Sequence, residues 1–428
     1  MVELLLGQVI RFEGEVMEEG PGAVRHEPAG AVALEGGRIL ATGPAADLIA
    51  TYPQARRTDL GRALLLPGFI DAHVHYPQTP MIASWGKRLI DWLNSYTFPT
   101  ESAFGDPAHA SKIAESYLDL AIAHGTTSMC SYCTIHPASV DAFFTGAEAR
   151  GMRALAGKTC MDRDTAPTFL RDTAQAAYDE SKALLGRWHG RGRLSYVITP
   201  RFSPTSTPEQ LRALGALWAE HPDCLMQTHL SEQVDEIAWV KSLYPQARDY
   251  LDTYEAYGLL GPNGVYGHAI HLEPREIVRL RDVGAAIAHC PTSNTFIGSG
   301  LFDMAGIAAA GIRVGLATDT GGGSSFSMLR TMAAAYEIAQ LRHHPLHPAK
   351  LIWLATQGAA RTLRIDHAVG NLAPGMEADL VALDLASTPV IAQRAARAES
   401  LWEELFPTIM MGDDRAVSGV WVGGKRLK

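Results

Sequence analysis

The stretch Pro67-Gly-Phe-Ile-Asp-Ala-His-Val-His75 decides the predicted fold. It continues the apolar run of residues 64–66, and such a run is typical of a strand that is buried on both faces. Because side chains alternate along a strand, we expect His73 and His75 to point to the same side and Val74 to point to the other. Two imidazoles on one side of a strand end can bind a metal ion, and histidine is a common neutral ligand of zinc. The alternative is a pair of hydrogen-bonded polar side chains where the strand leaves the core.

Length and charge limit the class of protein. With 428 residues, of which 47% are hydrophobic, the chain can form a large domain and a smaller one. The formal net charge is -9 and no basic cluster occurs, so we expect no nucleic-acid partner and no anionic membrane surface as a partner. The N-terminus lacks the pattern of a signal peptide, and no apolar run is long enough to span a bilayer.

The five cysteines are scattered along the chain, at positions 130, 133, 160, 224 and 290. An odd and dispersed set is typical of a reducing compartment and does not form a disulfide framework. We therefore predict that the protein is cytoplasmic.

From Pro67 onward, apolar runs alternate with amphipathic segments, which predicts βα units. The expected strand ends are His75, Cys130, Lys158, Arg201, His229, His268, Pro291 and Asp319. The clearest expected helices are residues 107–123, 167–188 and 208–220. About eight such units predict an α/β fold of the TIM-type (β/α)8 class, whose active site lies at the carboxyl ends of the strands.

Short β-type runs occupy both ends of the chain. They fill the segment before residue 67, return at 370–383 and end in a predicted hairpin around Gly423-Gly424. We predict a small β-sandwich domain built from residues 1–66 and 367–428, and a catalytic barrel from residues 67–366. The connection over residues 76–101 is long for a barrel, and long ordered loops at a barrel mouth usually carry function.

Three further polar residues fall at separate strand ends, His229, His268 and Asp319. One histidine at one strand end is most often structural. Several polar groups that converge on His73 and His75 at one end of a barrel instead predict a metal site.

Hydrolysis at a metal also requires groups that move protons. Asp319 can accept a proton from the attacking water, and His268 can hydrogen-bond that water. Glu232, three residues after His229, can give a proton to a ring nitrogen of the substrate. Alone, Glu232 would more often be a carboxylate that stabilises the start of a helix.

Several longer strings make the sequence similar to a known family. The string at residues 67–71 resembles the first barrel strand of the amidohydrolase superfamily. More specific strings together resemble the guanine deaminase family over nearly the whole chain: Tyr76-Pro-Gln78, Asp91-Trp-Leu-Asn-Ser-Tyr-Thr-Phe-Pro-Thr-Glu101, Thr199-Pro-Arg-Phe-Ser-Pro-Thr205, Thr228-His-Leu-Ser-Glu232, His289-Cys-Pro-Thr-Ser-Asn294 and Ala317-Thr-Asp-Thr-Gly-Gly-Gly323.

The resemblance implies zinc-dependent deamination of guanine to xanthine and ammonia by a homodimer. It implies one zinc ion held by His73, His75, His229 and Asp319. Proton transfer would fall to Glu232, His268 and Asp319, and purine binding to Gln78, Arg201 and Phe202. A site of three histidines and one aspartate also accepts iron. Deamination of a pterin or of 8-oxoguanine, or a non-catalytic scaffold, remain alternatives.

Arg201 also suits guanine on chemical grounds. A guanidinium only donates hydrogen bonds, and guanine presents O6 as an acceptor where adenine presents an amino donor. The alternative for Arg201 is an ordinary surface or ion-paired arginine. For Phe202, stacking on the base and packing in the barrel core are both consistent with the sequence.

Other motifs favour structural interpretations. Cys130-Ser-Tyr-Cys133 has the spacing of half a zinc site but no second pair follows, so we expect core packing. Lys158 ends the third run, whereas a lysine that bridges two metals would follow the fourth, where Arg201 lies; one metal per chain is therefore predicted. Gly321-Gly-Gly323 lacks the Lys-Ser/Thr of a phosphate loop, and we expect it to allow a tight turn beside Asp319.

Overall fold

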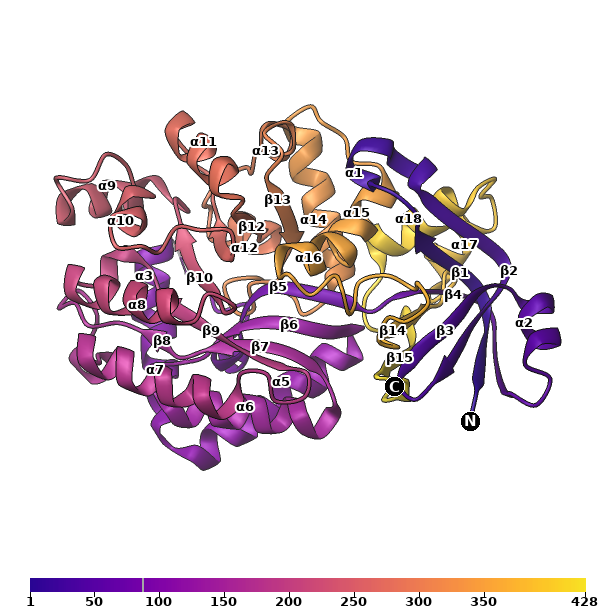
Figure 1. The fold of residues 1–428 in the computed structure, drawn as a ribbon. Coiled ribbons are helices and arrows are strands. Elements are labelled where there is room, and N and C mark those ends of the chain that lie inside the picture. Colours follow the sequence, from indigo (N-terminus) through magenta and orange to yellow (C-terminus); the bar gives the residue numbers. More distant parts are fainter. Residues whose placement is uncertain (87) are drawn as a thin grey trace.

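The computed structural model describes residues 1–86 and 88–428, and two sheets organise this part of the chain (Figure 1). Parallel strands of the larger sheet follow one another in space in the order β5-β6-β7-β9-β10-β11-β12-β13, and the short β8 pairs with β9. Their bounds are β5 (Phe69–His75), β6 (Thr126–Tyr132), β7 (Arg153–Gly157), β8 (Thr159–Cys160), β9 (Leu194–Pro200), β10 (Leu225–Leu230), β11 (Gly264–His268), β12 (Ala286–His289) and β13 (Arg313–Leu316). The predicted TIM-type barrel is confirmed.

Backbone hydrogen bonds join the first strand to the chain that follows the last strand. Asp319 N donates to His73 O at 3.0 Å, and His75 N donates to Thr320 O at 2.8 Å. These bonds bring the residues after β13 against the carboxyl end of β5. Every residue of β5 is buried, as its apolar sequence predicted.

Helices surround the strands, and several begin where a proline follows a capping residue (Figure 1). The predicted helices at 107–123 and 208–220 are confirmed as α5 (Pro107–Ala123) and α8 (Pro208–Glu220). The predicted helix at 167–188 begins too early. Residues Thr168–Leu170 form a 3-10 turn, and α7 (Ala174–Trp188) begins only after Thr173, whose side chain accepts a hydrogen bond from Ala176 N.

The remaining barrel helices connect later strands or follow β13. They are α6 (Pro137–Arg150), α9 (Val234–Leu243), α10 (Asp252–Glu255), α11 (Pro274–Val283), α12 (Pro291–Phe296), α13 (Met304–Ala309), α14 (Met328–Leu341), α15 (Pro348–Leu354) and α16 (Gln357–Thr362). The long connection after β5 contains short helical turns: η2 (Tyr76–Met81), α3 (Leu89–Trp92), η3 (Leu93–Thr97) and α4 (Phe98–Ser102).

The second sheet has seven strands from both ends of the chain, in the order β16-β15-β14-β4-β1-β2-β3. Its strands are β1 (Glu3–Phe12), β2 (Val24–Glu35), β3 (Arg38–Pro44), β4 (Arg56–Pro67), β14 (Leu380–Leu383), β15 (Val417–Val422) and β16 (Lys425–Arg426). β4 and β14 are antiparallel, with Leu380 opposite Pro67, and both termini lie on this side of the molecule (Figure 1). The predicted small β domain from both chain ends is therefore present, and its seven strands form one mixed sheet. The domain boundaries placed at residues 66 and 367 stay a prediction.

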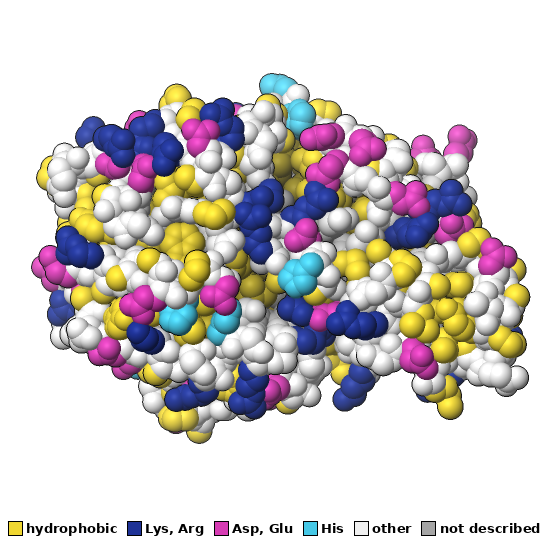
Figure 2. All heavy atoms as spheres, viewed as in Figure 1, with side chains coloured by type: hydrophobic (Ala, Val, Ile, Leu, Met, Phe, Trp, Pro, Cys, Tyr) yellow, Lys and Arg dark blue, Asp and Glu magenta, His cyan; other side chains and the backbone are white. Residues whose placement is uncertain are grey.

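Four helices were not predicted in the terminal segments. These are α1 (Val16–Glu19), α2 (Ala45–Thr51), α17 (Pro389–Ala395) and α18 (Leu401–Met411). On the face shown in Figure 2, the described basic and acidic side chains are interspersed. Among the described helices, none is both long and apolar enough to cross a bilayer.

Candidate active site

The side chains predicted as metal ligands lie together at the carboxyl end of the barrel. His73 and His75 come from β5, His229 from β10, and Asp319 follows β13. His75 Nε2 lies 3.1 Å from His229 Nε2, and Asp319 Oδ1 lies 3.5 Å from His73 Nε2 and 3.6 Å from His75 Nε2. Three separate parts of the chain thus bring nitrogen and oxygen atoms to one small space.

The electrostatic environment keeps these groups in the forms that bind cations. Burial, and then the neighbouring cationic groups, lower the pKa of His75 and His229 well below the ordinary histidine value. Burial alone would raise the pKa of Asp319, but the histidine rings around it, His73 foremost, lower it to about 2. The set therefore offers neutral imidazoles and one carboxylate.

The hydrogen bonds around these rings also fit a metal. His229 Nδ1 lies 2.7 Å from the carbonyl oxygen of Arg201, so a proton on Nδ1 leaves Nε2 free to face His75. His73 Nε2 and His75 Nδ1 are buried and have no hydrogen-bond partner in the described part of the chain. Leaving such atoms unpaired costs about 1 to 3 kcal/mol each, and a cation beside His73 Nε2 would remove that cost for this atom. The donor set suits zinc, and it suits iron as well.

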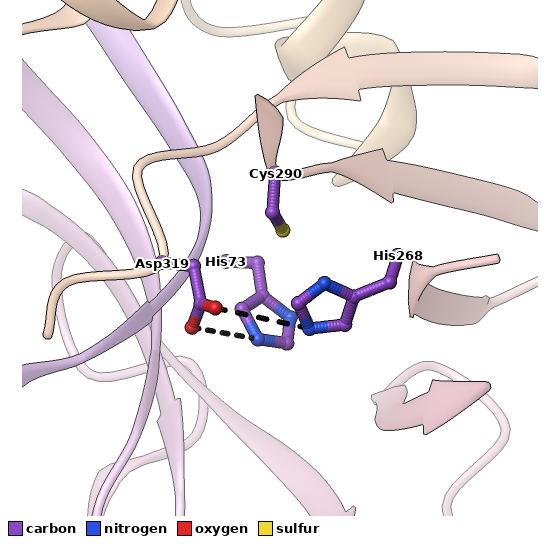
Figure 3. Close-up of side chains that lie close together, drawn as sticks. All are labelled: His73, His268, Cys290 and Asp319. Carbon is purple, nitrogen blue, oxygen red and sulfur yellow. Dashed lines mark ion pairs between the residues drawn. The ribbon is translucent and has the colours of Figure 1, made fainter. Parts of the chain in front are cut away.

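Cys290 lies close to the same group (Figure 3), and the sequence did not identify it as a neighbour. Its Sγ donates to the carbonyl oxygen of Ala288 at 3.5 Å. Burial raises the pKa of this thiol well above its usual range, so the sulfur keeps its proton here. A protonated thiol is a poor ligand, which favours the set of three histidines with Asp319.

The predicted proton-transfer groups form a chain of contacts next to the metal donors. His268 Nε2 lies 3.5 Å from Glu232 Oε2 and 3.8 Å from Asp319 Oδ2, and Figure 3 shows the contact with Asp319. Burial raises the pKa of Glu232 to about 7. Burial alone would lower the pKa of His268, but the carboxylates of Glu232 and Asp319 raise it above the ordinary value. A proton can therefore reside on either Glu232 or His268 near neutral pH.

Two residues that sequence reasoning missed hold these groups in place. Asn294 Oδ1 lies 2.9 Å from His268 Nδ1, so a proton on Nδ1 turns His268 Nε2 toward the carboxylates. The Ser299 hydroxyl donates to Glu232 Oε1 at 2.8 Å. Asn294 lies within a string that marked the family, whereas Ser299 gives no local signal. Both come from the segment that follows β12.

The backbone is unusual where the strands end. Ser231, His268, Ala269 and Asp319 have φ values of 48°, 66°, 48° and 48°. Residues other than glycine rarely adopt this left-handed backbone conformation, and those that do concentrate at functional sites. The conformation aims His268 and Asp319 across the barrel mouth.

The residues predicted to bind the purine line a cavity beside the metal donors. The space between these side chains is about 380 Å³, a volume that includes its open mouth. Its polar walls include Gln78 and Arg201, and its apolar walls are Leu89, Trp92, Leu93, Phe202 and Ile297. Phe202 also packs edge-on against His229 at 6.2 Å between ring centroids, so it serves both as a pocket wall and in packing.

Arg201 is both a pocket residue and an ion-paired one. It is 3% exposed, and its Nη1 lies 2.6 Å from Glu101 Oε2. Gln78 Nε2 donates to Glu101 Oε1 at 2.9 Å, and Gln78 Oε1 accepts from Gly321 N at 3.3 Å. Glu101 ends one of the strings that resemble the family, but nothing in the sequence indicated its role. Its partner Arg201 lies 100 positions away in the chain.

The motifs interpreted as structural behave as such. The Cys130 thiol is buried and donates to Gln227 Oε1 at 3.1 Å. Lys158 is buried and pairs with Asp172, and with Glu180 at 3.3 Å. A Cβ on Gly323 would lie 1.8 Å from the carbonyl oxygen of residue 318, so the turn after Asp319 requires glycine.

Comparison with known proteins adds independent evidence. Residues 64–427 match the amidohydrolase family, and residues 30–55 match an imidazolonepropionase-like composite domain of bacteria. The chain is 44% identical over 370 residues to guanine deaminase of Escherichia coli K12, covering 86% of this chain and 84% of that protein. Mouse guanine deaminase is 32% identical over 375 residues, covering 85% and 82%.

The chain belongs to the guanine deaminase family of amidohydrolases.

Solved structures from the guanine deaminase family have the same fold. The E. coli enzyme superposes with a TM-score of 0.97 at 40% identity, covering 100% of this chain and 99% of that one. Guanine deaminase from C. acetobutylicum, solved with guanine in its active site, gives a TM-score of 0.91 at 26% identity and covers 100% of both chains. The membership of the guanine deaminase family that the sequence strings indicated is confirmed.

Proposed function

We propose that this enzyme catalyses the hydrolytic deamination of guanine to xanthine and ammonia, with one zinc ion per chain. The observation that carries the proposal is the cavity shared by Arg201 with Glu232, His268 and Asp319. A donor suited to guanine O6 and the groups required for proton transfer face the same space. The relatives named guanine deaminase support the same substrate.

Purine binding in this proposal depends on a donor pattern. Arg201 presents N–H groups to O6, whereas adenine would present a second donor at that position and leave both groups unpaired. Gln78 is held through both of its amide atoms, so its orientation is fixed before the substrate enters. Phe202 and Trp92 give flat apolar walls for the ring.

The proton steps follow from the observed contacts. Water adds at C2 while Glu232, which holds a proton for part of the time near neutral pH, protonates N3. Asp319 is a carboxylate and accepts a proton from the attacking water, and His268 hydrogen-bonds that water. The proton on Asp319 then passes to the departing amine, the bond between C2 and nitrogen breaks, and ammonia leaves. The hydroxyl on C2 becomes the second carbonyl of xanthine, and its proton returns to Glu232.

His73, His75, His229 and Asp319 would hold the metal ion. A bound zinc ion lowers the pKa of water toward about 7, which makes hydrolysis feasible near neutral pH. Iron fits the same donors, and the element is an outcome of the test below.

We also infer a cytoplasmic homodimer that acts on a small purine without a nucleic-acid or membrane partner. The family resemblance supports the dimer, and the scattered cysteines support a reducing compartment.

Ammonia release from guanine, a pterin, 8-oxoguanine and adenine tests the proposal, with metal content measured on the same sample. We expect release from guanine well above the other substrates and about one zinc or iron per chain. Faster ammonia release from the pterin or 8-oxoguanine than from guanine would show that this compound is the substrate. No release from any substrate by metal-loaded protein would favour a non-catalytic scaffold.

A further inference from the structure

The carboxylate of Glu101 is fully buried and lies behind Arg201 and Gln78, two residues that line the purine cavity. Its Oε2 lies 2.6 Å from Arg201 Nη1, and its Oε1 lies 3.2 Å from Arg201 Nη2. The same Oε1 accepts a hydrogen bond from Gln78 Nε2 at 2.9 Å. One carboxylate therefore contacts both polar residues that we assign to purine binding.

The segment that carries Glu101 also restrains the guanidinium from a second side. Phe98, like Glu101, belongs to α4, and its ring centre lies 5.5 Å from Arg201 Cζ. A guanidinium group that is bonded to a carboxylate and packed against an aromatic ring has few alternative orientations. The N–H groups that do not face Glu101 remain available to the cavity.

The pair also sets the charge of this wall. Arg201 alone would be a cation 3% exposed to solvent and would attract anions strongly, because burial weakens screening. Glu101 pairs with both terminal nitrogens of Arg201, so the two charges cancel and the wall presents hydrogen-bond donors without a net charge. The other ionisable groups lining the cavity are His75, His229, Glu232, His268 and Asp319, and His136 also interacts electrostatically with Glu101.

We propose that Glu101 is a positioning and charge-selecting residue of the purine pocket: it aims the donors of Arg201 and Gln78 and prevents the pocket from retaining anionic oxopurines. This inference rests on the proposed function. Guanine is neutral near neutral pH, whereas xanthine carries a second ring carbonyl and loses a ring proton more readily. An unpaired arginine would hold that product anion and slow its release.

The test uses Glu101→Gln in the metal-loaded enzyme and two ligands that are not deaminated. At one mildly alkaline pH, xanthine is mostly an anion and hypoxanthine mostly neutral, and both carry O6. Calorimetry gives the ratio of their affinities. Removing one unit charge roughly 10 Å away, at an effective dielectric constant of about 20, changes binding by about tenfold. We expect this ratio to shift about tenfold toward xanthine, with weaker binding of neutral hypoxanthine. An unchanged ratio overturns the proposal.

Two further variants keep the test informative if Glu101→Gln does not fold. Arg201→Met leaves Glu101 as an unpaired anion, so the ratio should shift by about tenfold away from xanthine. The double variant Glu101→Gln/Arg201→Met removes both charges and should return the ratio to the wild-type value. A purely structural role predicts no such change of sign, and a double variant that differs from wild type by tenfold contradicts the charge argument.

Wild-type turnover separates this inference from the proposed function. If the wild type releases no ammonia from guanine, the proposed function fails. If the wild type deaminates guanine but the ratio of xanthine to hypoxanthine affinity does not change with the charge of residues 101 and 201, only the proposed role of Glu101 is wrong.

Discussion

Replacing Glu232 by glutamine separates its chemical role from its structural one. Glutamine keeps the shape of the side chain, and its amide oxygen can still accept the hydrogen bond from Ser299, which measures 2.8 Å in the wild type. It cannot deliver a proton. We therefore expect kcat for guanine to fall by at least about 100-fold, which corresponds to about 2.7 kcal/mol of barrier, while the bound metal stays.

The same substitution should not destabilise the fold. Burial raises the pKa of Glu232 to about 7, so the folded state binds a proton that the unfolded chain releases at lower pH. Below the pKa of an unfolded glutamate, burying Glu232 does not lower the free energy of unfolding. As the pH rises toward 7, the free energy of unfolding falls by up to about 3 kcal/mol, because the unfolded chain ionises first. The variant Glu232→Gln carries no such penalty, because an amide does not ionise. Above neutral pH, the variant should melt at the wild-type temperature or higher.

Ammonia release, metal analysis and thermal unfolding on one preparation complete this experiment. Near wild-type turnover with metal retained would refute the reasoning and would reduce Glu232 to a carboxylate at the start of a helix. Loss of metal together with a lower melting temperature would show that the residue is structural.

Further predictions concern neighbouring residues. In the wild type, kcat/KM should fall as the pH rises above about 7, because Glu232 loses the proton it donates, and this limb should be absent from the pH profile of Glu232→Gln. Ser299→Ala removes a hydrogen bond that favours the Glu232 carboxylate, so the pKa of Glu232 should rise and the alkaline limb should move up by about one pH unit; a limb that stays in place would contradict this. His75→Ala should lose most of its metal in elemental analysis, whereas the control His367→Ala, at an exposed position outside the cavity, should keep it. Arg201→Met should lower kcat/KM for guanine by about 30-fold to 1000-fold with unchanged metal content; a change below about threefold would count against purine binding by Arg201.

The sequence predicted the barrel well because its strands are short apolar runs that alternate with amphipathic helical segments. The first and sixth strands end at His75 and His268, as expected, and the eighth ends at Leu316, before the expected Asp319. The start of α7 was placed too early because apolar periodicity continues through a 3-10 turn, and only the Thr173 cap marks the true start. Such errors arise where capping decides the boundary.

The site residues divide in the same way. Histidines and an aspartate at strand ends could be found because the barrel brings every strand end to one mouth. Glu101 and Ser299 could not, because they act on partners 100 and 67 positions away and sit in connections rather than in strands. A positioning residue is identified by the contact that it makes, and the sequence around it carries no periodic signal.

We propose that this pocket recognises guanine through O6 and that the enzyme removes the 2-amino group. The most direct test is the ratio of kcat/KM for guanine to that for 2-aminopurine, which keeps the reacting amine and lacks O6, measured by ammonia release from the wild-type enzyme. Losing a charge-assisted hydrogen bond to a buried acceptor predicts a ratio of about 30 to 1000 in favour of guanine. Equal rates for the two purines, or no release from guanine by metal-loaded enzyme, would contradict the account.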